Sequence, residues 1–215
     1  MGLCGPAERK IMVDHTIAVE ESLKEGARLV LLGSQNAISG LSQMVGQEIE
    51  MTAISARQIP VDEIPDLFGG REKVAVAVYL AVSGDAEGHM FLVYPPETAM
   101  SLVDLLMGQE PGTTVEISEM EASALGEMGN IMGSFYLNAL SDASGLVLLP
   151  SPPAVIMDMA GSILDVALAD ILQESDDALV VEAVFSTKDQ KINGNFLVLP
   201  SPDFLKQLSA RAGGK

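Results

Sequence analysis

Cysteine, histidine and basic residues are scarce in this chain of 215 residues. Cys4 is the only cysteine, so no disulfide can form within the chain. With His15 and His89 as the only histidines, the sequence has no Cys–His cluster typical of a zinc site and few candidates for a histidine-based triad. It also has no glycine-rich phosphate loop and no dinucleotide fingerprint. We therefore expect no metal or cofactor bound by this protein itself.

Long apolar runs are absent as well. No stretch approaches the roughly 18 uncharged apolar residues of a membrane span, and the start lacks the basic and apolar regions of a signal peptide. The sequence therefore predicts a soluble, cytoplasmic protein.

Positively charged residues are few: the chain has 12 Lys and Arg against 30 Asp and Glu. The net charge is −18, and no Lys or Arg lies between Lys73 and Lys188. Such a field repels nucleic-acid phosphates and anionic lipids, so the charge disfavours roles on nucleic acids or membrane surfaces, and a partner should tolerate or prefer an acidic surface. The alternative interpretation is that acidity keeps a Met- and Ala-rich chain of mean hydropathy +0.31 soluble.

Polar residues recur at helical spacing between residues 117 and 141. At about 100° per residue, Ser123, Glu127 and Asn130 fall within roughly 60° of one another. Ser134 and Asn138 continue this polar stripe. The opposite face is apolar and carries Ala124, Leu125, Met128, Met132, Phe135, Tyr136 and Ala139. The pattern predicts an amphipathic helix with Glu127 and Asn130 accessible and with Met128, Met132 and Phe135 buried.

Two further features belong to this predicted helix. Ser118 and Glu121 form the S-x-x-E pattern of a capping box at its start. Gly126, Gly129 and Gly133 lie beside the polar stripe and lower helix propensity, which suggests a close approach by another backbone. A solvated helix face without function is the alternative interpretation of Glu127 and Asn130.

The two halves of the chain resemble each other. The strand-like segment 88–97 parallels 194–203, and residues 39–42 parallel 138–141 at an offset of 99 residues. This register places Lys24, Arg28 and Leu31 opposite Ser123, Glu127 and Asn130. We predict one domain over residues 1–215, built from pseudo-repeats of about 14–108 and 115–211 that are joined near residues 109–112.

Periodicity and turn signals predict an α/β fold in which each half has the order helix, three strands, helix. The two long helices should lie side by side on one face of a sheet. The expected helices are 18–45, 96–107, 117–141, 159–173 and 202–211, with a short helix or loop over 61–67. The expected strands are 47–58, 73–83, 87–95, 145–157, 178–187 and 193–200.

The complete pattern is Ser123-x3-Glu127-x2-Asn130-x22-Pro153. It resembles the signature of the CheC/CheX/FliY family of chemotaxis phosphatases, which dephosphorylate the response regulator CheY. The resemblance extends from about residue 14 to about residue 210. The length and the two similar halves resemble CheC-type members, whereas FliY-type members carry an additional flagellar-switch domain, for which we expect no room here.

The resemblance implies roles for these residues. Asn130 would enter the active site of phosphorylated CheY and position the attacking water, and Glu127 would contact the regulator's active-site lysine. Ser123 and Pro153 would support the motif by trimming the helix face and shaping the neighbouring loop. The catalytic Mg²⁺ would belong to CheY.

Family members often carry a second Glu-x2-Asn in the first half. Here Arg28 and Leu31 take those places, which predicts a lost first site. The competing interpretation is a non-enzymatic, CheC-like scaffold that binds CheD, the chemoreceptor deamidase, and regulates receptor modification. Such a scaffold needs no Glu-Asn pair.

Overall fold

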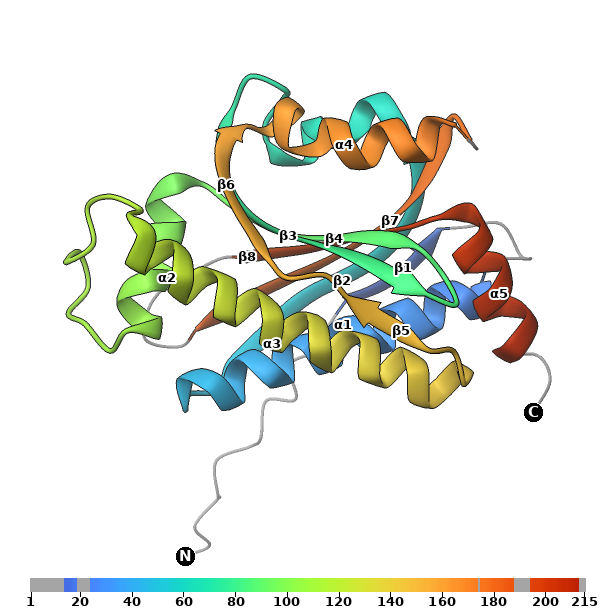
Figure 1. Cartoon of the computed structure of the whole chain (residues 1–215), viewed down its shortest axis with the longest axis horizontal. Helices are drawn as coiled ribbons and strands as arrows, with labels where there is room; N and C mark the ends of the chain where they lie inside the picture. Colours follow the sequence, from blue (N-terminus) through green and yellow to red (C-terminus); the bar gives the residue numbers. More distant parts are fainter. Residues whose placement is uncertain (1–13, 19–23, 174, 188–193, 213–215) are drawn as a thin grey trace, which may run out of the picture.

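The fold is built on one curled sheet with helices on both faces (Figure 1). A computed structural model describes residues 14–18, 24–173, 175–187 and 194–212. The strand order is β1-β2-β7-β8-β4-β3-β5, and β6 also pairs with β3. β1 runs parallel to β2, and the other pairs are antiparallel. Helices α1, α3, α2 and α5 pack on one face, and the 3-10 helix η2 and helix α4 pack on the other.

The elements follow the predicted order. The first half contains β1 (Asp14–Ala18), α1 (Lys24–Val45), β2 (Ile49–Pro60), η2 (Val61–Phe68), β3 (Val74–Gly84), β4 (Gly88–Tyr94) and α2 (Pro96–Leu106). The second half contains α3 (Glu119–Ser144), β5 (Leu148–Pro150), β6 (Ala154–Met159), α4 (Ala160–Leu172), β7 (Asp177–Thr187), β8 (Gly194–Pro200) and α5 (Pro202–Ala212).

The bounds of these elements agree with the predicted repeat. α1 ends 99 residues before α3 ends, β2 begins 99 residues before β5 begins, and β2 ends 99 residues before β6 ends. β4 and α2 precede β8 and α5 by 106 residues each. The long helices α1 and α3 are thus equivalent, and they lie side by side on one sheet face, as the sequence predicted.

Two predicted elements were wrong in part. The expected helix over 18–45 overlaps β1, because Ala18 ends a strand that pairs along the outer edge of β2. Thr16 and Ile17 are β-branched residues that suit such a strand. The expected strand over 145–157 is divided into β5 and β6 by residues 151–153. Pro152 and Pro153 lack the N–H group that a continuous ladder needs.

Glycines allow α1 and α3 to approach each other closely. A Cβ atom placed on Gly33 of α1 would lie 2.7 Å from the ring of Tyr136 on α3. A Cβ on Gly40 would lie 2.8 Å from the ring of Phe135. Because both rings lie where side chains of α1 would otherwise stand, the position of α3 against α1 is closely determined.

A second set of glycines lets α3 approach the sheet. Gly126, Gly129 and Gly133 are buried, but the predicted close approach by another backbone was wrong. The approaching atoms belong to side chains and not to a backbone: a Cβ on Gly129 would lie 2.5 Å from Cγ1 of Val78, and one on Gly133 would lie 3.1 Å from Cδ2 of Leu80. β-Branched and leucine side chains of β3 therefore fill the groove that the glycines leave.

The buried carboxylate of Asp104 holds the connection between the halves. Its two oxygens accept backbone hydrogen bonds from Gly112 at 2.6 Å, Thr113 at 3.2 Å and Thr114 at 2.8 Å. Burial alone would raise the pKa of Asp104, but hydrogen bonds from the Thr114 side chain and from these backbone groups outweigh burial and lower the pKa below its ordinary value. The ionised form is therefore the one that the fold stabilises.

We expect Asp104→Asn to lower the free energy of unfolding by about 2–3 kcal/mol at neutral pH, because an amide cannot accept all three N–H groups. Since the pKa is lower in the folded state, the advantage of the wild type is complete above the ordinary aspartate value of 3.8 and is lost as pH falls through the folded-state value. Urea unfolding of both proteins across this range measures the difference. A difference that stays constant down to the lowest pH would contradict this account.

Gly129→Ala and Gly126→Ala should have opposite effects on stability. The new methyl at residue 129 meets the stiff side chain of Val78, and overpacking of this kind costs about 1–3 kcal/mol. The methyl at residue 126 meets nothing closer than 3.7 Å, so the gain in helix propensity of up to about 1 kcal/mol remains. Thermal unfolding compares the two variants, and Val78→Ala should restore the stability lost in Gly129→Ala.

Candidate functional site

The start of α3 is fixed by local sequence. Ser118 is the N-cap, and the predicted capping box is present: the Ser118 backbone N–H donates to the Glu121 carboxylate at 3.0 Å. A further hydrogen bond, from the Ser118 hydroxyl, is the main reason that the pKa of Glu121 lies below its ordinary value. A carboxylate in the first turn also suits the helix dipole.

The buried side of α3 determines which residues face solvent. Leu125, Met128, Met132 and Tyr136 are fully buried. Phe135 is only half-buried, contrary to the prediction, because its ring lies over Gly40 at the outer side of the contact with α1. With one flank of α3 on α1 and one on the sheet, the remaining flank is left for the polar stripe.

The predicted site residues lie on this remaining flank. Ser123 and Glu127 are exposed, and Asn130 is half-buried, so the predicted accessibility of Glu127 and Asn130 is confirmed. Asn138 is exposed and Ser134 half-buried farther along the helix. Within the described residues, the Glu127 carboxylate and the Asn130 amide have no hydrogen-bond or ion-pair partner. Both groups are therefore available to an incoming molecule.

Pro153, in the loop between β5 and β6, lies next to the same flank of α3. A Cβ on Gly126 would lie 3.7 Å from Cγ of Pro153, so the proline packs one position away from Glu127 on α3. The preceding Ser151 anchors this loop to β3: its backbone N–H donates to the Ala81 carbonyl at 2.8 Å, and its hydroxyl accepts from the Ala81 N–H at 3.0 Å. All four positions of the motif thus lie in one region.

The equivalent positions on α1 look different. Arg28 is exposed and pairs with Glu25 one turn earlier. Leu31, in the place of Asn130, is 6% exposed and belongs to the core. Lys24, in the place of Ser123, is half-buried. The α1 face therefore offers neither an accessible carboxylate nor an accessible amide at these positions.

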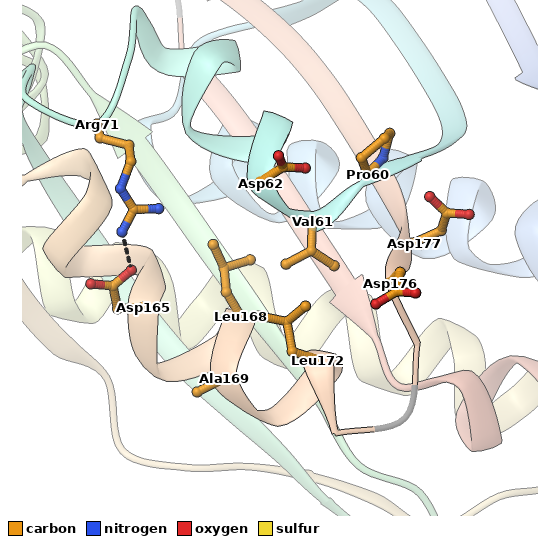
Figure 2. Close-up of a pocket in the computed structure, with 10 residues that line it drawn as sticks. All are labelled: Pro60, Val61, Asp62, Arg71, Asp165, Leu168, Ala169, Leu172, Asp176 and Asp177. Carbon is orange, nitrogen blue, oxygen red and sulfur yellow. Dashed lines mark hydrogen bonds and ion pairs between the residues drawn. The ribbon is translucent and has the colours of Figure 1, made fainter.

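A cavity lies away from these residues, on the other face of the sheet. This cavity, of about 720 Å³, lies between η2, α4 and the start of β7. Figure 2 shows its lining, with apolar Val61, Leu168 and Leu172 beside several aspartates. An ion pair of 2.5 Å joins Arg71 to Asp165 at its side (Figure 2). η2 and α4 pack on the sheet face opposite to α3, so this cavity is separate from the Glu127–Asn130 stripe. The stripe is a helix surface and not a small-molecule pocket.

A second polar cluster was not found by sequence reasoning. Tyr79 on β3 and His89 on β4 share a hydrogen bond of 3.0 Å between the hydroxyl and Nδ1, and Nε2 of His89 lies 3.5 Å from the Asp170 carboxylate on α4. Burial lowers the pKa of His89, partly offset by Asp170 and Glu87. The cluster joins α4 to the sheet.

Two further searches concern only the described residues. They contain no group of three or more His, Cys, Asp or Glu side chains placed to hold a metal ion. Within the same residues, no helix is both long enough and apolar enough to cross a membrane.

Comparisons with known proteins agree with this geometry. The model of the CheC-like family matches residues 120–157, a range that contains all four motif positions. Among solved structures, FliY from Thermotoga maritima has the same fold, with a TM-score of 0.71 at 21% identity over 91% of this chain and 97% of that one. The CheX chain of a CheX–CheY–BeF3–Mg complex from Borrelia burgdorferi has a TM-score of 0.52 at 22% identity over 81% of this chain and 96% of that one.

A curated relative decides the family. The protein named CheY-P phosphatase CheC from Bacillus subtilis is 31% identical over 186 residues, which cover 85% of this chain and 89% of the relative. Identity of this extent over both halves, and a family match centred on the Glu127–Asn130 helix, show that the chain belongs to the CheC-like family of chemotaxis proteins.

Proposed function

We propose that this protein dephosphorylates the phosphorylated response regulator CheY and that Asn130 positions the attacking water. The observation that carries the proposal is the accessible pair of Glu127 and Asn130 on α3, which has no partner within the described part of the chain and lies inside the segment that matches the CheC-like family. The relative from B. subtilis is named for this activity, and the complex from B. burgdorferi pairs a protein of this fold with CheY.

The chemistry asks little of the phosphatase. Hydrolysis of an aspartyl-phosphate proceeds mainly through positioning of the nucleophile and stabilisation of charge. A neutral amide can hydrogen-bond a water molecule and align it opposite the leaving carboxylate oxygen, and it needs no ionisation to do so. Asn130 fits this role because its amide is only half-buried and is not committed to the core.

Glu127 has a different role in the proposal. It lies about 60° around the helix from Asn130 and is exposed, so it can reach a basic group on the regulator while the amide reaches the water. A carboxylate contact to the regulator's active-site lysine would be a charge-assisted hydrogen bond that orients the two proteins. In the proposal, the small side chain of Ser123 leaves room for the regulator beside Glu127, and Pro153 fixes the neighbouring loop against α3. Mg²⁺ would be supplied by the regulator.

Asn130→Ala should lower the rate constant for catalysed decay of phosphorylated CheY by about 100-fold while binding stays largely intact, because the amide acts on the reacting water more than on docking. Decay of ³²P-labelled CheY measures the rate, and titration with BeF3⁻-activated CheY measures binding. Asn138→Ala, the same change on an exposed residue of the same helix, serves as the control. Phosphorylated CheY should decay in its presence at the wild-type rate. Equal rates for Asn130→Ala and wild type would contradict the mechanism.

Glu127→Ala should weaken binding as well as turnover, because it removes a contact between the two proteins. Its matched control is Arg28→Ala, which removes the charged side chain at the equivalent position of α1 and should leave both quantities unchanged. The same titration and decay measurements apply. If Arg28→Ala were as damaging as Glu127→Ala, the proposed loss of the first site would be wrong.

The wild-type protein itself provides the decisive comparison. If it speeds the decay of no phosphorylated CheY from the same cell, the proposal fails, and the non-enzymatic scaffold that binds CheD becomes the better interpretation.

A further inference from the structure

We propose that the activated regulator also docks on an apolar surface at the open edge of the sheet, next to the polar stripe of α3. This surface, the edge patch, consists of Val74 on β3 and of Met157 and Met159 on β6. The inference rests on the proposed function and adds to it the second half of the contact surface.

The edge patch is contiguous and exposed. Val74, Met157 and Met159 are 49%, 59% and 45% exposed. Val74 lies directly opposite Met159 in the β3–β6 ladder, and Met157 lies two residues along the same strand. Side chains two apart on a strand share one face. Large apolar side chains gathered on a free sheet edge need an explanation, because such edges otherwise promote aggregation.

The edge patch lies on the same sheet face as α3. Val155, two residues before Met157, packs towards α3: its Cγ2 would lie 3.8 Å from a Cβ on Gly126. Met157 and Met159 therefore point to the helix layer, but α3 does not cover them. Because α1 occupies the inner flank of α3, the polar stripe faces outward, above the sheet edge that β6 forms.

Met120 adds an exposed apolar side chain near the start of α3, next to the polar stripe. It is 65% exposed and lies seven residues before Glu127, so it stands almost directly in line with Glu127, two turns towards the start of α3. The polar groups of the site are thus flanked by exposed methionines from the helix and from the strand. Methionine suits a surface that must adapt to a partner.

The other half of the molecule serves as an internal control. At the repeat offset of 99 residues, Gln58 and Pro60 of β2 correspond to Met157 and Met159. Val74 begins β3 and opposes Met159, and in the other half Asp177 begins β7 and opposes Pro60, so Asp177 corresponds to Val74. The half with the lost Glu-Asn pair therefore has no apolar edge patch. The apolar surface is present where the Glu127–Asn130 pair is present.

The two edges of the sheet also differ in how far another strand covers them. β1 pairs along the outer edge of β2, whereas among the described residues no strand pairs along the outer edge of β6. β1 pairs with residues 53–57 of β2, so the half with Glu127 and Asn130 is the half with the less covered sheet edge. A second copy of this chain is a poorer occupant than the regulator, because the net charge of −18 opposes self-association.

The test combines Met157→Ser with Met159→Ser and measures binding of CheY activated with BeF3⁻ and Mg²⁺ by isothermal titration calorimetry. We expect the dissociation constant to rise about tenfold, while kcat for phosphorylated CheY at saturation stays within about twofold of wild type, because these residues contact the regulator away from the reacting phosphorus. Met157→Leu with Met159→Leu should bind like the wild type. Leu172→Ser, which removes a leucine of similar exposure on α4, is the matched control and should change neither value.

The outcomes separate the two proposals. Unchanged affinity in the serine variant, with normal hydrolysis by the wild type, overturns the edge patch and leaves the proposed function standing. Weakened binding in the serine variant, in a protein that binds CheY but does not hydrolyse its phosphate, supports the edge patch and overturns the proposed function. A wild-type dimer by light scattering that becomes a monomer in the serine variant, at unchanged affinity for CheY, shows that a second copy occupies the patch and overturns the inference.

Discussion

The close packing of α3 against both α1 and the sheet is the constraint on which the site depends. Aromatic rings of α3 occupy the space left by Gly33 and Gly40, and side chains of β3 occupy the space left by Gly129 and Gly133. A helix held on two sides at such short range cannot rotate about its axis without steric overlap. The flank that carries Glu127 and Asn130 is therefore presented in one orientation, which matters for a reaction that depends on alignment.

The pseudo-twofold repeat makes the asymmetry of the two halves informative. α1 and α3 occupy equivalent positions, yet one presents Arg28 paired with Glu25 above a buried leucine, and the other presents a carboxylate and an amide that have no partner among the described residues. The sheet edges differ as well, since β1 covers part of one edge and the other carries exposed methionines. Because the scaffold is shared, these differences reflect surface chemistry and not a different fold.

Much of this could be predicted because helical and strand periods leave clear patterns. The apolar spacing of Leu125, Met128 and Met132 identified the buried side of α3, and the ungapped offset of 99 residues identified Arg28 and Leu31 as its counterparts. The five residues of β1 could not be predicted, since so short a strand is specified by the open edge of β2 and not by its own pattern. The partial exposure of Phe135 and the Tyr79–His89–Asp170 cluster depend on contacts between segments far apart in sequence. Such contacts leave no local signal.

A site on a helix surface suits the size of the proposed substrate. A small phosphate ester would need a pocket that surrounds it, whereas an aspartyl-phosphate on a regulator already sits in an active site with its own metal and lysine. In the proposed mechanism, what remains for the second protein is to present one amide at the correct point and to hold the two surfaces together. A rigid helix supplies the first, and a broad surface beside it supplies the second. The scarcity of histidine, cysteine and lysine in this chain is compatible with that proposed division, because the proposed task uses an accessible Asn130 and not a nucleophile.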